Sequence, residues 1–368
     1  MTMSNQAHQM YALSLDQCVA AVKAVGHLRT ILLQGDMGGG KTSTMITLAA
    51  DLPTHVACYF DCTTKDIGDL NLPNMAVMNE QGYVTFVPNE ELGAHLGKPI
   101  ILMIDELGKA NPAVKNALLR VMQERTVGSI KLHPDSIVYA TTNKGSEGVG
   151  DILPPHARNR VSVVQVRKST NMDWIEWGIN AGIDHSLLGW CKDNPHLFAP
   201  FEDVKDPDEN PYIFHPKQQR AAFVTPRSLH AASDILHQRH AFDDQTLTGL
   251  LMGTIGDRGA MDLMAFVKMS DQLPSRDSIK DDPMSAKVPD SAAAVCMVVY
   301  RTLATMEADY INAWMDYMPR LDNEAQGMFA NGVRSAKYSR DKQALVMSNK
   351  KFTNWARDNN HLFTADKK

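Results

Sequence analysis

Cysteine is scarce in this chain, and the few cysteines are not spaced like a binding site. The five of them, an odd number, are scattered without a CxxC pair and without clustered histidines. This spacing argues against a zinc site and against a disulfide framework. Cys58 and Cys62 flank an apolar segment, so we interpret them as small buried side chains.

Long apolar runs are also absent. The longest lies near residues 292–300 and is much shorter than the roughly 18 residues that a membrane-spanning helix needs. The N-terminal residues MTMSNQAHQM contain no apolar signal-peptide core. We therefore expect a cytoplasmic protein that does not contact a membrane.

The chain lacks the overall positive charge of a general nucleic-acid-binding surface. Its formal net charge is −5, but residues 333–368 carry nine Lys/Arg against three Asp, which leaves about −11 for the rest. Tyr338, Phe352, Trp355 and Phe363 are interleaved with these basic residues. Such a tail could stack on bases and contact phosphates. Alternatively, it forms a helical pair whose aromatic side chains pack on the rest of the protein, or it docks a partner protein.

What remains is the composition of an ordinary globular protein with room for two or three domains. Its N-terminal half alternates between apolar strands and helices. We expect helices at 14–26, 44–52 and 112–124, and strands at 30–33, 56–61, 100–106 and 136–143. Apolar strands separated by helices predict a parallel sheet that is covered on both faces.

A glycine-rich segment lies between the first expected strand and the helix after it. It consists of Gly35, Asp36, Met37, Gly38, Gly39, Gly40, Lys41, Thr42 and Ser43, and satisfies the pattern G-x-x-x-x-G-K-[ST]. Glycines allow successive backbone N–H groups to approach phosphates, and the following helix presents its positive end. In this pattern, Lys41 reaches the β- and γ-phosphates of ATP and the Thr42 hydroxyl binds Mg²⁺.

Two further strands end in polar residues. Asp105 and Glu106 follow the apolar strand from residue 100, where Asp105 would bind Mg²⁺ and Glu106 would polarise the attacking water. Asn143 ends the strand from residue 136, and the strand ends of a parallel sheet share one edge. We therefore expect Asn143 beside Glu106, in contact with the water or the γ-phosphate, although an Asn that begins a turn would also explain it.

Arginines follow in two short segments. Arg158 and Arg160 lie in LPPHARNRV, and Arg227 lies in TPRS. Arginines of this kind can stabilise phosphoryl transfer within one subunit or from a neighbouring one. From the residues alone, surface ion pairs explain them as well.

Together these segments resemble the AAA+ superfamily and, within it, the MoxR-like branch. DELGKANPAVKNALLRVMQERTV is similar to that branch's Walker B continuation, DEINRA followed by a helix and a β-hairpin. LPPHARNRV is similar to its LPEALLNRF, and TPRS to its sensor 2 segment. The resemblance covers about residues 20–266 and departs from the family where Gly108 and Lys109 replace the usual Asn-Arg pair.

The resemblance implies a fold and a set of roles. It implies an AAA+ nucleotide-binding core in residues 1–166 and a helical lid in 167–280 with a Pro-rich irregular connection. Beyond the resemblance, residues 274–290 (PSRDSIKDDPMSAKVPD) look like a linker, and we expect a linker and a helical C-terminal region with the basic tail in 281–368. By carry-over, Asp105 and Glu106 match Walker B, Asn143 matches sensor 1, Arg160 matches the arginine finger and Arg227 matches sensor 2. Arg158 is a second candidate for the finger.

The resemblance also implies an ATPase that assembles into a ring. A finger that acts on a neighbouring subunit requires the nucleotide to lie between subunits, most simply in a hexamer. Members of this branch remodel partner proteins, often ones with a von Willebrand A-type domain. The alternative is a nucleic-acid loader or translocase that uses the basic tail.

One more segment bears on a partner. Residues 65–87 contain Tyr83 and Phe86 and lie where the family inserts elements that face the pore of the ring. Aromatic side chains in a pore can grip a peptide. A surface hairpin packed on the core would explain the same residues.

Overall fold

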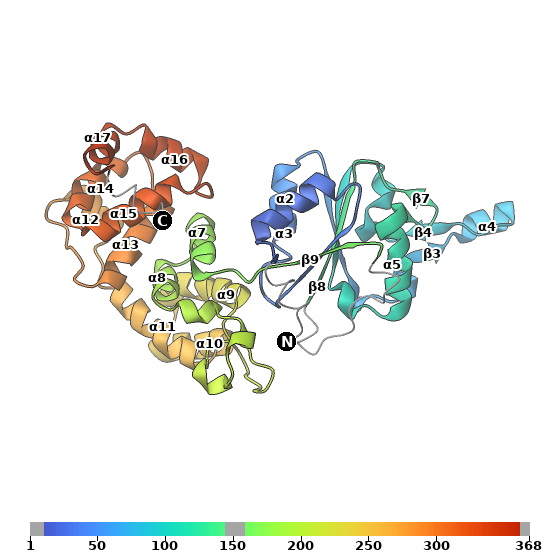
Figure 1. The fold of residues 1–368 in the computed structure, drawn as a ribbon, viewed down its shortest axis with the longest axis horizontal. Coiled ribbons are helices and arrows are strands. Elements are labelled where there is room, and N and C mark those ends of the chain that lie inside the picture. The colour runs from blue at the N-terminus through green and yellow to red at the C-terminus, as the bar shows by residue number, and fades with distance from the viewer. Residues whose placement is uncertain (1–10, 144–158, 361–368) are drawn as a thin grey trace. The chain divides into compact units, whose positions relative to one another are not determined.

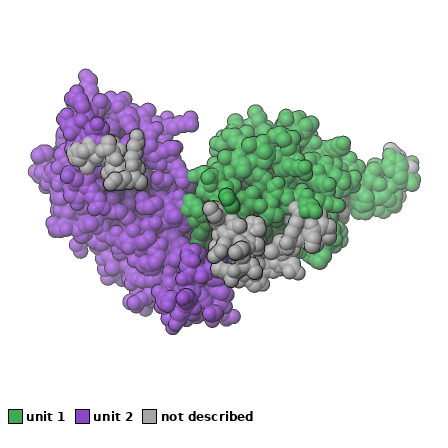
Figure 2. All heavy atoms as spheres, in the orientation of Figure 1, with its two compact units in different colours: residues 1–168 green, residues 169–368 purple. Residues whose placement is uncertain are grey.

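The computed structural model describes residues 11–143 and 159–360. The chain divides into two compact units, residues 1–168 and 169–368 (Figure 2). The first unit contains every described strand with more than one residue, and the second is built from helices and short turns.

A five-stranded parallel sheet forms the centre of the first unit (Figure 1). In order across the sheet, its strands are β2 (Val56–Asp61), β5 (Ile100–Asp105), β8 (Ile137–Asn143), β1 (Ile31–Gly35) and β9 (Ser162–Gln165). Gly35 is in register with Asn143, and Asp61 with Asp105. The polar ends of four strands therefore lie along one edge of the sheet.

Successive side chains of the central strands enter two different cores. Leu102 of β5 packs in the core formed with α5 (Pro112–Glu124), whereas Met103 packs in the core formed with α2 (Leu15–Val25) and α3 (Thr44–Asp51). All six residues of β5 are buried. A strand that is covered on both faces must be apolar at nearly every position, which explains its uninterrupted apolar run.

Local sequence signals set the ends of the helices. The Ser14 hydroxyl accepts a hydrogen bond from the backbone N–H of Gln17, whose side chain accepts one from the backbone N–H of Ser14. This capping box satisfies two donors that the first turn of α2 leaves open. Asn111 caps α5 in a similar way, with Pro112 in the first turn.

Two antiparallel hairpins extend from the first unit. The shorter consists of β6 (Thr126–Val127) and β7 (Ile130–Lys131), which follow α5 as the helix and hairpin of the resemblance imply. In the longer one, β3 (Asn71–Pro73) pairs with β4 (Phe86–Pro88), and α4 (Met75–Gln81) lies between them. This longer hairpin projects away from the central sheet (Figure 1).

The projecting hairpin carries exposed apolar side chains. Tyr83 is 56% exposed and Phe86 is 43% exposed, and Leu72 and Val87 are also exposed. A hairpin therefore forms here, but its aromatic side chains do not pack on the core of the unit.

Eleven helices form the second unit within the described part of the chain. They are α7 (Asn171–Ala181), α8 (His185–Asp193), α9 (Pro226–His237), α10 (Asp244–Ile255), α11 (Asp257–Ser270), α12 (Arg276–Asp281), α13 (Ala292–Ala304), α14 (Ile311–Tyr317), α15 (Asn323–Arg334), α16 (Arg340–Met347) and α17 (Lys350–Asp358). Between α8 and α9, three short 3₁₀ turns give the ordered but irregular connection expected from its prolines.

One hydrophobic core runs through the whole second unit. The stretch 274–290, which we expected to be a linker, contains α12 and contributes Ile279 and Ala286 to this core. Arg276 pairs with Glu307 at 2.7 Å and ties α12 to the segment before α14. The expected boundary after residue 280 lies within this core, and the division into a lid and a C-terminal region stays a prediction.

The aromatic residues of the basic tail are buried. Tyr338, Phe352 and Trp355 are at most 9% exposed. The Tyr338 hydroxyl donates to the Leu303 carbonyl at 2.8 Å, and Trp355 Nε1 donates to Gln326 Oε1 at 3.0 Å. These three rings pack as the helical alternative predicted, whereas Phe363 lies outside the described residues. Deletion of residues 333–368 would therefore remove part of a core.

The predicted fold class is confirmed. The chain has an α/β core with a five-stranded parallel sheet flanked by helices, and helical regions follow it. Among the described residues, no helix has the length and apolar character needed to cross a membrane.

Candidate active site

The glycine-rich loop connects the end of β1 to the start of α3. Gly38 and Gly40 have φ angles of 65° and 87°, in the left-handed region where residues with a Cβ are strained. The backbone N–H of Ser43 donates to Gly40 O at 3.1 Å, so a tight turn precedes Thr44. The loop conformation therefore depends on two of the glycines that define the sequence pattern.

Lys41 is held inside this loop. Its side chain is buried, and Nζ donates to the carbonyls of Gly35 at 2.9 Å and Asp36 at 2.7 Å. Nζ also donates to Asn143 Oδ1 at 2.8 Å. Uncharged oxygens thus surround the ammonium group in these contacts. An anion that enters the loop would offer it a stronger, charge-assisted partner.

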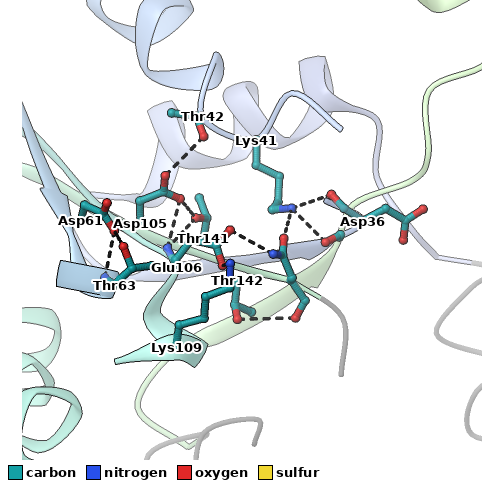
Figure 3. A network of polar contacts seen from close by, with 12 residues as sticks. Asp36, Lys41, Thr42, Asp61, Thr63, Asp105, Glu106, Lys109, Thr141 and Thr142 are labelled. Atoms are coloured by element: carbon teal, nitrogen blue, oxygen red, sulfur yellow. Dashed lines mark hydrogen bonds and ion pairs between the residues drawn. The ribbon is translucent and has the colours of Figure 1, made fainter. Parts of the chain in front are cut away.

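The Asp105 carboxylate accepts four hydrogen bonds. Thr141 Oγ1 and the backbone N–H of Glu106 donate to Oδ1, the latter at 3.1 Å. Tyr59 OH donates to Oδ2 at 2.8 Å, and Thr42 Oγ1 donates to the same oxygen at 3.3 Å. The side chains of Thr42, Asp105 and Thr141 converge in Figure 3. The orientation of the carboxylate is therefore set by three strands and the phosphate loop.

Glu106 lies directly after β5 in an unusual backbone conformation. Its φ angle is 51°, which is uncommon for a residue with a side chain and recurs at active sites. Glu106 Oε1 accepts a hydrogen bond from Asn143 Nδ2 at 3.0 Å, and Oε2 lies 3.3 Å from Lys109 Nζ. We expected Asn143 beside Glu106 because parallel strands end at one edge, and the structure places them together. Their catalytic roles stay predictions.

The turn after Glu106 is packed closely against β8. A Cβ atom on Gly108 would lie 2.3 Å from Thr142 Oγ1, so no side chain fits there without movement. Residues Leu107–Lys109 form a 3₁₀ turn that brings Lys109 back to Glu106. The departure from the family at Gly108 therefore has a local steric reason, and Lys109 pairs with Glu106.

Three residues of this network were missed by reasoning from the sequence. Tyr59 lies two residues before Asp61 on β2, and Thr141 lies two residues before Asn143 on β8. Alternation along a strand places residues two apart on the same face, and this signal could have pointed to both. Lys109 lies three residues after Glu106, a spacing that brings side chains together only if a helical turn follows the strand.

The site also affects the ionisation of Tyr59. Partial burial, the hydrogen bond to Asp105 and the nearby carboxylates raise the pKa of its hydroxyl above the ordinary value. The hydroxyl therefore stays protonated at neutral pH and acts as a hydrogen-bond donor to Asp105.

The predicted arginines that the structure describes lie on elements that contribute no residue to this network. Arg160 is exposed in the turn before β9, and Arg227 is exposed in the first turn of α9 in the second unit. Arg158 lies outside the described residues. The roles of all three stay predictions.

Arg160 lies at the side of the sheet where the strands begin, whereas the phosphate loop of its own chain lies at the side where they end. The first residue of β9, Ser162, is in register with Ile31 at the start of β1, whereas the loop follows the end of β1 at Gly35. At about 3.3 Å per residue, the length of β1 separates Arg160 from the phosphate loop by roughly 13 Å or more. At this separation the Arg160 side chain does not reach the loop of its own chain.

The donor set fits a phosphate group and a divalent cation. Two hard oxygens, the Thr42 hydroxyl and Asp105 Oδ2, lie 3.3 Å apart. Neighbouring ligands of an octahedral Mg²⁺ with bonds of about 2.1 Å are about 3 Å apart, so only a small adjustment would be needed. A cationic side chain, a glycine loop at a helix N-terminus and a carboxylate beyond them can bind a polyphosphate and direct a water to it.

Comparison with known proteins gives only distant sequence relatives. No protein-family profile matches the chain. It is 27% identical over 140 residues to a Nif-specific regulatory protein of Rhodobacter capsulatus, a match that covers 36% of this chain. The chain spans only 24% of the length of that relative.

Several solved structures are similar at low identity. A putative ATPase from Cytophaga hutchinsonii has a TM-score of 0.34 at 19% identity, with coverage of 47% of this chain and 52% of that one. A mutant of Thermotoga maritima RuvB has a TM-score of 0.35 at 16% identity, covering 85% and 87%. Hsp104 with ATPγS and casein has 0.36 at 17%, covering 73% and 48%. None of these likenesses is close enough to define an activity for this chain.

Proposed function

We propose that this chain is an AAA+ ATPase that binds Mg·ATP and hydrolyses it to ADP and phosphate. The main support is the hydrogen-bonded series from Lys41 through Asn143 to Glu106, which runs beside the Thr42–Asp105 pair at one edge of the sheet. Phosphoryl transfer needs a phosphate clamp, a cation site and a base for water within reach of each other. Residues that could serve each of these three purposes lie next to one another at this edge of the sheet.

In this proposal the phosphates bind in the loop Gly35–Ser43. Lys41 Nζ exchanges its contacts with neutral oxygens for the β- and γ-phosphates, and the backbone N–H groups of the loop donate to the rest. Thr42 and Asp105 hold Mg²⁺, which neutralises phosphate charge when bound.

Glu106 is the proposed general base. Its Oε1 and Oε2 face Asn143 and Lys109, so the carboxylate is positioned before the substrate arrives. It accepts the proton of the attacking water. Asn143 Oδ1 accepts a hydrogen bond from that water once Lys41 has left it, or Asn143 Nδ2 turns from Glu106 and donates to the γ-phosphate. Arg227 and Arg158 are proposed contacts of the phosphates or of the transition state.

Phosphate release from ATP by the purified full chain tests this proposal directly. We expect release with Mg²⁺ present and its loss when EDTA removes the metal. If the chain neither binds nucleotide nor releases phosphate under these conditions, the proposal is wrong.

We further propose that the chain acts as a ring of six copies, with Arg160 as a finger for the neighbouring site. The exposure of Arg160 and its position across the sheet from its own loop support a role in trans. An interface that repeats head to tail can close into a ring.

Mixing two inactive variants tests the finger. Arg160→Ala should bind ATP nearly normally but lose nearly all hydrolysis, and Lys41→Ala should lose its own site while it keeps an intact finger. In an equal mixture, about one quarter of head-to-tail interfaces combine an intact loop with an intact finger, so about that share of wild-type activity should return.

The matched control is Arg29→Ala, because Arg29 is an exposed arginine just before β1 at the same edge of the sheet. It should keep wild-type activity. Arg158→Ala should be measured in the same mixture, since either arginine of the segment fits the family pattern. If mixed rings form but neither the Arg160→Ala mixture nor the Arg158→Ala mixture regains ATPase activity, a finger in trans is ruled out.

The finer proposal is a MoxR-type ring that remodels or activates a partner protein, with von Willebrand A-type proteins as first candidates. The exposed Tyr83 and Phe86 on the projecting hairpin support contact with a polypeptide. A Glu106→Gln chain that holds ATP would be the bait for isolating this partner.

The nucleic-acid alternative has lost its main support. Tyr338, Phe352 and Trp355 are buried and cannot stack on bases. Some of the basic residues in the tail also pair within the unit, as Lys351 does with Asp316 at 2.6 Å.

A further inference from the structure

One feature of the site lies outside the sequence patterns: a tyrosine hydroxyl on the carboxylate that is proposed to hold Mg²⁺. Tyr59 OH donates to Asp105 Oδ2 at 2.8 Å, the same oxygen that accepts from Thr42. On its other oxygen, Asp105 accepts from Thr141 and from the backbone N–H of Glu106. Tyr59 thus supplies one of the four donors to the Asp105 carboxylate. Among the described residues, it is the only side-chain donor to Asp105 that comes from β2.

The position of Tyr59 follows from the pairing of β2 and β5. In this parallel pair, Tyr59 is in register with Met103, and Asp61 with Asp105. Cys58 and Phe60, on either side of Tyr59, are buried in the core with α5, so Tyr59 faces the other side of the sheet, where α3 and the phosphate loop lie. Its long side chain then spans the two positions to Asp105.

Packing alone does not account for this tyrosine. Its side chain is 40% exposed at the edge strand of the sheet, whereas Phe60 beside it is fully buried. A large aromatic residue at such a position gains less from burial than one in the core. Its hydroxyl, in contrast, makes one of the shorter contacts to the carboxylate, with the geometry of a charge-assisted hydrogen bond.

We propose that Tyr59 is a positioning residue that holds Asp105 Oδ2 toward the Thr42 hydroxyl, so that the pair is arranged for Mg²⁺ before the metal binds. This inference rests on the proposed Mg·ATP site. A metal bound between Thr42 and Asp105 would displace only the 3.3 Å hydrogen bond between them, which leaves one lone pair of Oδ2 for Tyr59 and one for the metal. Without the tyrosine hydroxyl, Oδ2 keeps only the 3.3 Å contact to Thr42, and the carboxylate is held mainly by the two donors on Oδ1, so Oδ2 is less well ordered before the metal binds.

Groups that orient a metal ligand typically change metal affinity by about 10- to 100-fold. The Tyr59→Phe substitution removes only the hydroxyl and keeps the ring. We expect the Mg²⁺ concentration needed for half-maximal binding of a fluorescent ATP analogue to rise by about tenfold. Affinity for the same analogue in EDTA should not change, and saturating MgCl₂ should restore most of the hydrolysis rate.

Tyr212→Phe is the matched control, because the Tyr212 hydroxyl also donates to a carboxylate, that of Asp262, and neither residue has a role in the proposed site. It should leave the Mg²⁺ dependence at the wild-type value. Thermal unfolding of all variants should be followed in parallel, and Tyr59→Phe should melt close to the wild type.

Three results would overturn the role of Tyr59. The first is an unchanged Mg²⁺ requirement, and the second is an equal loss of binding with and without metal. The third is a melting temperature well below that of the wild type, since the hydroxyl would then serve the fold. The Lys41→Ala chain shows whether a negative result contradicts only the positioning role of Tyr59 or the proposed Mg·ATP site as a whole. If Lys41→Ala loses nucleotide binding while Tyr59→Phe behaves as wild type, only the positioning role is wrong, whereas wild-type binding by Lys41→Ala contradicts the proposed function itself.

Discussion

Glu106→Gln is expected to bind ATP at least as tightly as the wild type but to hydrolyse it about 10²- to 10⁴-fold more slowly, because an amide cannot accept the proton of the attacking water. The substitution keeps the size of the side chain. The loss should therefore appear in kcat, with little change in the affinity for nucleotide.

The network around Glu106 adds a reason for undiminished binding. Lys41 donates to Asn143 Oδ1, which fixes the Asn143 amide so that Nδ2 must donate to Glu106, while Lys109 approaches the second oxygen. All these partners are donors. The introduced amide must direct its own N–H₂ group at one of them, which destabilises the nucleotide-free site and favours release of Lys41 to a phosphate.

Single-turnover hydrolysis and equilibrium binding of a fluorescent ATP analogue measure the two effects separately. Glu90→Gln removes the same charge from an exposed residue of the first unit and should behave as wild type. Near-normal turnover of Glu106→Gln would exclude Glu106 as the base. Loss of binding instead would mean that the residue supports the loop rather than the chemistry.

Lys41→Ala is expected to abolish hydrolysis and to weaken ATP binding by about 10- to 100-fold or more. A hydrogen bond to a charged group contributes about 1.5 to 3 kcal/mol, and the β- and γ-phosphates would lose the one ammonium group that the loop supplies. The nucleotide-free loop also changes, because the carbonyls of Gly35 and Asp36 and the Asn143 side chain lose a shared donor.

Calorimetric titration with ATP and MgCl₂ measures this loss, and a melting curve reports whether the loop change affects the fold. Lys131→Ala is the matched control, since Lys131 is an exposed lysine on β7 in the same unit. Unchanged ATP affinity in Lys41→Ala would refute the assignment of the glycine-rich segment as a phosphate loop.

The elements that the sequence predicted well are those set by local or repeating patterns. The expected strands at 56–61 and 100–106 coincide with β2 and β5 to within one residue, because both show as unbroken apolar runs, although only β5 is buried throughout. The predicted proximity of Asn143 and Glu106 followed from the parallel sheet, since that topology brings strand ends together whatever their spacing along the chain.

Contacts that depend on the face of a strand or on packing were not predictable in this way. The interleaved aromatic residues of the tail fitted both a stacking surface and a buried helical pair. Only the packing of α13, α15 and α17 shows that Phe352 and Trp355 enter the core. Similarly, the polar and proline-containing stretch 274–290 looked like a linker until Ile279 was found fully buried.

By itself, the sequence determined the class of chemistry: glycines at Gly38 and Gly40 for a left-handed loop, a lysine and a hydroxyl at its end, and paired acids after an apolar strand. These are local requirements, so they are written in consecutive residues. The tertiary structure alone decided which groups hold these residues in place, namely Tyr59 on Asp105 and Lys109 on Glu106. Those contacts depend on strand register and on a turn packed against a neighbouring strand, which no short segment of sequence specifies.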